Sequence, residues 1–213
     1  MNDVLIIDYG LCNLKSIENA FKYLDIKAVI SSNPNDLNNY NHIILPGVGA
    51  FKDGMQGLKR AGFLNPLKES VSKNKIILGI CLGMQMLLTE SYEFGKHKGL
   101  GFIDGIVKPF KPIKENDNYI VKVPQIGWNS IKVKKSWLNT PFSKTSNNED
   151  MYFVHSFYCK VNNEEDVLAT TEYANVNFHS IIASKNVFGC QFHPERSGDK
   201  GLVILEEFSK LNI

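Results

Sequence analysis

The stretch KIILGICLGMQML, residues 75–87, changes character in its middle. Its first half is a continuous apolar run of the kind that forms a buried strand, and its second half favours a helix. A single cysteine, Cys81, stands at the junction between Gly79 and Gly83. Glycines on both sides of one residue predict a tight strand-to-helix turn, which projects the central side chain from the edge of a sheet.

The segments before this turn alternate between strand and helix. Apolar runs bounded by turn residues predict strands at residues 3–8, 26–30, 42–45 and 75–80. Apolar residues at helical spacing predict a helix over residues 13–24, with Asn13 as its N-cap, and a helical stretch over residues 51–73 that is broken by Gly and Pro. This alternation predicts an α/β fold, in which a mostly parallel twisted sheet is flanked by helices on both faces.

From about residue 100 the pattern changes to short strands separated by turns, which predict additional antiparallel hairpins in the C-terminal half. The closing segment LVILEEFSKL has the apolar spacing of an amphipathic helix. No repeat or linker divides the sequence, and 213 residues are enough to bury one sizeable core. We therefore expect a single domain over residues 1–213.

The composition is that of an ordinary globular protein and excludes several classes of function. The net charge of +2 is too small to indicate a nucleic-acid partner. No apolar run is long enough to cross a membrane. The four cysteines are far apart in the sequence, a pattern that favours a reducing cytoplasm over a disulfide framework or a metal site.

The predicted turn suits Cys81 to nucleophilic catalysis. At the start of a helix, the helix dipole and the free N–H groups favour the thiolate form of a cysteine. The N–H of Leu82 would then point at an oxyanion formed on an attacked carbonyl group. The alternative is a buried structural cysteine in an ordinary turn, and the motif alone leaves both interpretations open.

A thiolate nucleophile needs an acid–base partner, and His193 is the best candidate among the five histidines. It follows the apolar strand VFGCQF and precedes Pro194, so we expect it at a strand end. Glu195 is placed to hold the imidazole in its working tautomer. His155 in FVHSFY is the rival, because it also lies in a predicted strand, and its alternative role is structural.

Several motifs together resemble a known family. GICLGMQ around Cys81 and FHPE around His193 resemble the class I, triad-type glutamine amidotransferases. Further motifs follow the pattern of one branch of that family, the glutaminase subunits of imidazole glycerol phosphate synthase; they are IIDYGLCNLKSI, LPGVGAF, KGLGFIDG, VPQIGWN, YFVHSFY and HPERS. The resemblance covers essentially the whole chain and implies the flavodoxin-like fold of class I amidotransferases.

The resemblance implies hydrolysis of L-glutamine to glutamate and ammonia through a thioester on Cys81, with no cofactor and no metal ion. A second oxyanion-hole N–H would come from Val48 or Gly49 in LPGVGAF. The family pattern places glutamine-binding positions at Gln85, Glu93, Ser156 and Phe157. Gln85 also follows Cys81 by one helical turn, so the two share a helix face. The alternative for Glu93 is a solvated loop acid.

Ammonia has to reach an acceptor before it is protonated, and the sequence contains no phosphate-binding loop to bind one. The acceptor is therefore expected on another polypeptide. The resemblance implies a (β/α)8-barrel cyclase subunit of histidine biosynthesis, which forms a heterodimer with this chain. The side chains expected at the interface are Asn13, Trp128 and Arg196.

Three residues depart from the family pattern: Cys12 replaces a glycine, Gln125 replaces a histidine, and Arg196 replaces a lysine. By family analogy, all three are expected toward the partner. Such changes would also suit a paralogous glutaminase that supplies ammonia for amidination of a surface-glycan sugar, and this alternative stays open, as does a stand-alone glutaminase. An inactive scaffold is disfavoured, because the three catalytic candidates are all present.

Overall fold

A computed structural model describes residues 2–115 and 118–212. The first group of elements comprises β1 (Val4–Ile7), α1 (Leu14–Tyr23), β2 (Ala28–Ser31), η1 (Pro34–Asn39), β3 (His42–Leu45), α2 (Phe51–Arg60), α3 (Leu64–Ser72), β4 (Ile76–Ile80) and α4 (Leu82–Met86). The second comprises β5 (Leu88–Ser91), β6 (His97–Lys98), β7 (Ile103–Pro109), β8 (Ile113–Glu115), β9 (Asn118–Val121), β10 (Gln125–Ser130), β11 (Lys132–Val133), β12 (Asp150–His155), β13 (Phe157–Val161), η2 (Glu164–Asp166), β14 (Val167–Tyr173), β15 (Val176–Ser184), β16 (Val187–Cys190), η3 (Pro194–Arg196) and α5 (Gly198–Lys210). None of the helices in these ranges combines the length and the apolar composition that a membrane crossing requires.

Most of the described strands form one twelve-stranded sheet in the order β2-β1-β3-β4-β16-β15-β13-β7-β5-β6, with β14 and β11 attached beside β15. The five strands from β2 to β16 run parallel to one another. The strands from β16 to β7 pair antiparallel. The prediction of a parallel sheet followed by antiparallel hairpins is therefore confirmed.

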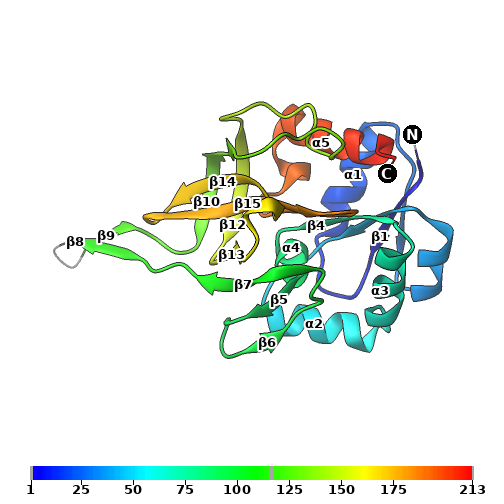
Figure 1. Cartoon of the computed structure of the whole chain (residues 1–213), viewed down its shortest axis with the longest axis horizontal. Helices are drawn as coiled ribbons and strands as arrows, with labels where there is room; N and C mark the ends of the chain where they lie inside the picture. The colour runs from blue at the N-terminus through cyan, green and yellow to red at the C-terminus, as the bar shows by residue number, and fades with distance from the viewer. Residues whose placement is uncertain (1, 116–117, 213) are drawn as a thin grey trace.

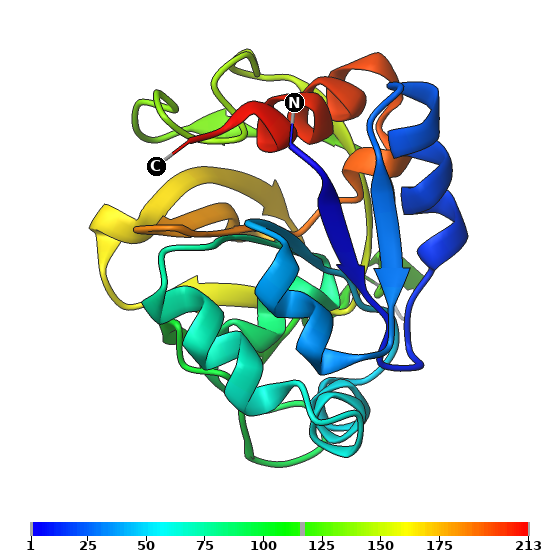
Figure 2. The same cartoon turned by 90° about the vertical axis from the view of Figure 1, so that its right-hand side faces the viewer.

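Helices cover both faces of the parallel half of the sheet (Figure 1 and Figure 2), and alternate residues of its central strands pack against the two layers. Val4 and Ile6 of β1 pack into the cluster that contains the buried faces of α1 and α5. Leu5 and Ile7 pack into the cluster that contains those of α2 and α3. Strands covered on both faces bury every side chain, which explains why the sequence shows continuous apolar runs there.

The last strand in the sequence, β16, returns to the parallel half of the sheet and lies beside β4. In this register Cys190 at the end of β16 is level with Ile80 at the end of β4. The segments that follow the two strands therefore meet at one edge of the sheet, and they carry Cys81 and His193. A separate two-stranded sheet of β10 and β12 packs at the same edge, where the N–H of His193 donates to the carbonyl of Tyr152 at 2.9 Å.

The structure adds detail to three of the predicted helical segments. The helical segment over residues 51–73 is broken, as predicted, and forms two helices, because Gly62 takes a φ of +78° between α2 and α3. The helix after Cys81 has only 5 residues, since the chain turns into β5 at Leu88. Asn13 occupies the N-cap position of α1, but its side chain makes no capping hydrogen bond.

Gly79 and Gly83 are required by close backbone approach at the turn between β4 and α4. A Cβ atom at Gly83 would lie 1.8 Å from the carbonyl oxygen of Leu45, at the end of β3. A Cβ atom at Gly79 would lie 2.8 Å from the carbonyl carbon of Gly83. Backbone atoms in a close-packed interior have no room to move aside. The turn therefore depends on both glycines for the steric reason that the sequence indicates.

Replacement of Gly83 by alanine tests this dependence. We expect Gly83→Ala to lower the free energy of unfolding by about 2–3 kcal/mol, because the added methyl group forces α4 away from β3. Gly54→Ala in α2 is the control, since its Cβ would meet the sulfur of Met86, at the flexible end of a side chain. Urea denaturation of both variants measures the difference. Wild-type stability of Gly83→Ala would contradict the steric argument.

Candidate active site

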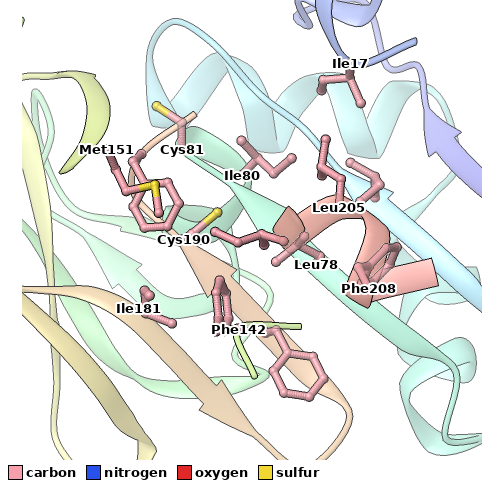
Figure 3. Close-up of a cluster of buried hydrophobic side chains, with 14 of the residues drawn as sticks. Ile17, Leu78, Ile80, Cys81, Phe142, Met151, Ile181, Cys190, Leu205 and Phe208 are labelled. Atoms are coloured by element: carbon pink, nitrogen blue, oxygen red, sulfur yellow. The ribbon is translucent and has the colours of Figure 1, made fainter. Parts of the chain in front are cut away.

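Cys81 lies at the carboxyl end of the parallel strands, on the turn between β4 and α4. Its φ is +54°, a left-handed backbone conformation that few residues other than glycine adopt. Its N–H donates to the carbonyl of Cys190 at 2.9 Å, and its thiol donates to that of Val154 at 3.7 Å. Figure 3 shows Ile80 within the buried apolar cluster and Cys81 at the margin of that cluster. The turn therefore carries a nucleophilic atom from the core to a cavity.

His193 reaches the same cavity from the segment after β16. Its Nδ1 lies 2.8 Å from Oε1 of Glu195, whose side chain is only 1% exposed. Burial lowers the pKa of His193, but the neighbouring Cys81 and Glu195 outweigh burial and raise this pKa to about 10. The imidazole is therefore protonated at neutral pH, between a carboxylate that orients it and the sulfur.

His155, the rival candidate, lies nearby with its ring already engaged. Its Nδ1 lies 2.7 Å from the carbonyl oxygen of Phe157, and its Nε2 lies 3.0 Å from the side-chain oxygen of Gln125. Burial lowers the pKa of His155 to about 4, so the ring is neutral. Because both ring nitrogens have partners, the geometry favours His193 as the acid–base group.

A cavity of about 510 Å³ opens over Cys81, within the size range of small-molecule sites. Most of the predicted site residues line it, namely Asn13, Val48, Gly49, Cys81, Leu82, Gln85, Glu93, Ser156, Phe157, His193 and Arg196. Glu195 contacts His193 without lining this cavity, and Trp128 lies outside it. The structure therefore gathers at one place residues that are scattered over most of the sequence.

The two predicted sources of oxyanion-hole N–H groups differ in whether their N–H is already hydrogen-bonded within the chain. Leu82 begins α4, so its N–H lies outside the helical hydrogen-bond pattern, and the residue borders the cavity. The N–H of Val48 instead donates to the carbonyl of Leu11 at 3.0 Å. The adjacent Gly49 has a φ of +92°, which glycine adopts without strain. In this structure Val48 does not offer its N–H group to an oxyanion.

Gln85 approaches the cavity with its amide nitrogen already engaged. The side-chain Nε2 of Gln85 donates to the carbonyl oxygen of Phe157 at 3.0 Å and to Oε1 of Gln191 at 3.1 Å. An amide nitrogen has two N–H groups, so both donors of Gln85 are used. The remaining Oε1 of Gln85 is an acceptor, which suits it to bind a ligand through an ammonium group.

Glu93 is buried, so its interpretation as a solvated loop acid is wrong. The residue is 7% exposed, and its carboxylate accepts a hydrogen bond from the N–H of Phe51 at 2.5 Å. Burial raises the pKa of Glu93. Phe51 begins α2, so this carboxylate satisfies one of the free N–H groups of that helix while it lines the cavity.

Two of the three predicted interface residues line the cavity, and the third, Trp128, is joined to one of them through Tyr152. Asn13 and Arg196 are exposed and line it. The guanidinium carbon of Arg196 lies 4.7 Å from the ring centroid of Tyr152, a cation–π contact. The Trp128 ring, 57% exposed, packs edge-on against the same tyrosine with centroids 5.9 Å apart. Tyr152 therefore links Trp128 to Arg196, and together they form an exposed aromatic and cationic surface.

Of the three departures from the family pattern, Gln125 does not lie toward a partner, contrary to the prediction. It is 3% exposed and contacts His155, because β10 alternates and turns Ile126 and Trp128 outward instead. Cys12 is half-buried, and its thiol donates to the carbonyl of Ile7 at 3.8 Å. Burial raises the pKa of the Cys12 thiol to about 11, so this cysteine is a poor nucleophile at neutral pH.

Gln191 contacts the site, although it belongs to none of the predicted site residues. It is fully buried, and its Nε2 donates to the sulfur of Cys81 at 3.7 Å while its Oε1 accepts from Gln85. One feature of the sequence could have indicated its role. Gln191 is the only strongly polar residue inside the apolar run VFGCQF, and a buried polar side chain requires hydrogen-bond partners.

The arrangement has the parts of an acyl-transfer site. It combines a nucleophilic sulfur, an acid–base imidazole oriented by a carboxylate, and backbone N–H groups beside one cavity. Across residues 2–115 and 118–212, no group of three or more His, Cys, Asp and Glu side chains is placed to hold a metal ion.

The comparison with known families decides which acyl transfer this is. A model described as glutamine amidotransferase class-I matches residues 5–210. The chain belongs to the class I glutamine amidotransferases. One relative of this amidotransferase, imidazole glycerol phosphate synthase subunit HisH of Chlorobium chlorochromatii, is 46% identical, with 98% of this chain and 100% of the relative covered. Subunit HisH 1 of Legionella pneumophila (strain Lens) is 42% identical, with 99% and 100% covered.

Solved structures share the fold of this amidotransferase at low sequence identity. PurLQS from Thermotoga maritima superposes with a TM-score of 0.73 at 18% identity and covers 99% of each chain. A crystal structure described as glutamine amidotransferase gives a TM-score of 0.71 at 17% identity, with 96% of this chain and 98% of the other covered. These likenesses support the fold, and the family assignment rests on the sequence matches.

Substitution of the acid–base pair tests its role. We expect His193→Asn to lower kcat by about 10³-fold, because the leaving nitrogen loses its proton donor. Glu195→Gln should lose less activity, since the carboxylate only orients and polarises the imidazole. Ammonia release measured by a coupled assay gives both values. His179→Asn, away from the cavity, is the control, and near-normal turnover in His193→Asn would transfer the role to His155.

Proposed function

We propose that this amidotransferase is the glutaminase subunit of an imidazole glycerol phosphate synthase and supplies ammonia for histidine biosynthesis in the cytoplasm. The observation that carries the proposal is the convergence of Cys81 and the His193–Glu195 pair at one cavity. That convergence occurs in a chain whose HisH relatives match it over nearly its whole length. Residues 1–213 act as one functional unit in this proposal.

The first half of the proposed reaction forms a thioester. The Cys81 sulfur attacks the side-chain amide carbon of L-glutamine, and the carbonyl oxygen becomes an oxyanion. The N–H of Leu82 stabilises this oxyanion, together with an N–H from Val48 or Gly49. Protonated His193 transfers a proton to the amide nitrogen, the carbon–nitrogen bond breaks, and ammonia departs. Each backbone donor contributes roughly 3 kcal/mol to the stabilisation of such a transition state.

The second half releases glutamate. His193 is left neutral by the first proton transfer, and it takes a proton from water as that water attacks the thioester carbon. The carbon–sulfur bond then breaks, which restores the Cys81 thiolate and the protonated imidazole. Gln85, Glu93 and the backbone at Ser156 and Phe157 hold the amino-acid end of glutamine throughout. The free Oε1 of Gln85 faces its ammonium group.

The partner is a (β/α)8-barrel cyclase subunit that receives the ammonia. Its docking face includes Asn13, Trp128 and Arg196, of which Trp128 is the anchor, since a large exposed aromatic side chain contributes most at such contacts. The exposed Ile126 lies on the same side of β10 as Trp128 and enlarges this apolar face. A cyclase seated there covers the mouth of the cavity and keeps ammonia from bulk water.

The hydrogen bond from Val48 to Leu11 supports a control function for the loop LPGVGAF. The N–H of Val48 reaches an oxyanion only after this bond breaks and the peptide next to Gly49 rotates. Leu11 precedes Asn13 by two residues, so a partner that contacts Asn13 is placed to disturb the bond. Glutamine is then consumed only when an acceptor is bound to the cyclase.

The sugar-amidination alternative loses part of its support in the structure. It rested on departures at Cys12, Gln125 and Arg196 as signs of a changed interface. Gln125 is buried against His155 and belongs to the support of the site, so its change carries no information about a partner. The HisH relatives at 42% and 46% identity favour the histidine pathway instead.

Removal of the nucleophile tests the reaction itself. We expect Cys81→Ala to abolish ammonia release from glutamine while affinity for the cyclase subunit stays within about twofold, because the sulfur lies inside the cavity. Cys159→Ala, which deletes a fully buried thiol in β13, is the control and should keep turnover. Isothermal titration measures the affinity. Residual thiol-dependent turnover in Cys81→Ala would exclude Cys81 as the nucleophile.

Partner dependence tests the proposed control. The isolated chain should bind glutamine but hydrolyse it slowly, and the cyclase subunit with its nucleotide ligand should raise kcat by about 10²-fold or more. A gain in kcat with little change in KM is expected, because an oxyanion-hole donor acts only in the transition state. Steady-state kinetics with and without the partner decide the matter. Full turnover by the isolated chain would contradict the control, though not the glutaminase reaction.

A further inference from the structure

Gln191 directly follows β16, and the parallel register places it next to the nucleophile. Cys190 is level with Ile80 in that register, so the next residues along the two strands, Gln191 and Cys81, lie side by side. The backbone confirms the alignment, because the N–H of Cys81 donates to the carbonyl of Cys190, and the N–H of Gln191 donates to that of Ser180, both at 2.9 Å. The backbone pairing of the sheet therefore fixes the position of Gln191 independently of its side-chain contacts.

The side-chain amide of Gln191 joins the nucleophile to a glutamine-binding residue. Its Nε2 donates to Sγ of Cys81 at 3.7 Å, and its Oε1 accepts from Nε2 of Gln85 at 3.1 Å. These are the two side-chain hydrogen bonds that Gln191 makes within the described residues. The residue is 0% exposed, so water does not replace either bond.

The contact with sulfur gains strength when the sulfur is charged. A thiolate accepts hydrogen bonds more strongly than a thiol does, and bonds to charged acceptors are about twice as strong as neutral ones. A buried amide nitrogen whose acceptor is Cys81 therefore stabilises the thiolate relative to the thiol. It also restricts where the sulfur sits.

We propose that Gln191 is a positioning residue that holds the Cys81 thiolate for attack and fixes the orientation of the Gln85 amide. One buried carboxamide thereby couples the nucleophile to the residue that receives the substrate. The part of this inference that concerns Gln85 rests on the proposed glutaminase function. The part that concerns the sulfur depends only on the geometry at Cys81.

Alkylation of Cys81 tests the sulfur contact without glutamine or a partner. Gln191→Met keeps the length of the side chain and removes the donor, and Gln191→Glu replaces the donor with a negative charge. At pH 7 we expect iodoacetamide to alkylate Cys81 roughly tenfold more slowly in Gln191→Met than in the wild type, as loss of one charge-assisted hydrogen bond predicts. Gln191→Glu should react more slowly still. Peptide mass spectrometry identifies the modified cysteine.

A matched control separates positioning from general destabilisation. Asn186 is also a buried amide next to β16, and its Nδ2 donates to the carbonyls of Val71 and Lys75, away from the cavity. Asn186→Leu should lower the melting temperature and leave the alkylation rate of Cys81 unchanged. A melting curve for each variant shows that the alkylated protein is folded. If Asn186→Leu slowed alkylation as much as Gln191→Met, the proposed role would be wrong.

The kinetics with glutamine test the link to Gln85 in the complex with the cyclase subunit. Gln191→Glu keeps an oxygen that accepts from Gln85, so KM should stay within about twofold while kcat falls at least tenfold. Gln191→Met loses that acceptor as well, so KM should rise in addition. Wild-type alkylation rates in both variants would overturn the proposal. If the Gln191 variants are alkylated slowly but the wild-type complex does not hydrolyse glutamine, the positioning role stands and the glutaminase function is rejected.

Discussion

The close approach of Gly83 to the carbonyl oxygen of Leu45 is the constraint on which the site depends. A Cβ atom at residue 83 would lie 1.8 Å from that oxygen, so α4 begins against the end of β3 only because residue 83 is glycine. With β4 on one side and α4 on the other, Cys81 is held at a φ of +54°. Strain of this kind persists where the surrounding structure over-determines the backbone, and here it aims the sulfur at the cavity.

The topology of the sheet brings the second half of the site to this turn. Because β16 returns to lie parallel to β4, the residues after it reach the same edge as Cys81. They bring His193, whose proton serves the leaving group in the proposed reaction, and Glu195, whose carboxylate lies 2.8 Å from Nδ1 of His193. Gln191 belongs to the same segment, and its Nε2 donates to the sulfur of Cys81. One strand pair therefore places a nucleophile, an acid and a hydrogen-bond donor.

The sequence was sufficient to predict the α/β fold, since the strands of the parallel half are buried on both faces and appear as unbroken apolar runs. It was also sufficient to nominate Cys81, because a cysteine between two glycines at a strand end has a recognisable steric meaning. It did not reveal Gln191, whose role depends on the register between strands that are distant in the sequence. The inward position of Gln125 was missed. It follows from the alternation of β10, in which an exposed Trp128 places Gln125, three residues earlier, on the buried face. The hydrogen bond from Val48 to Leu11 joins two loops, and no local pattern encodes it.

The central claim is that this turn makes the sulfur of Cys81 the atom that forms a thioester with the side-chain acyl group of glutamine. The most direct measurement is rapid acid quenching of the chain with its cyclase partner and L-glutamine, followed by mass spectrometry of the intact protein and its peptides. The account predicts a γ-glutamyl thioester on the peptide that contains Cys81, and its loss in Cys81→Ala. Ammonia release without any covalent adduct, or an adduct on Cys12, Cys159 or Cys190, would contradict it.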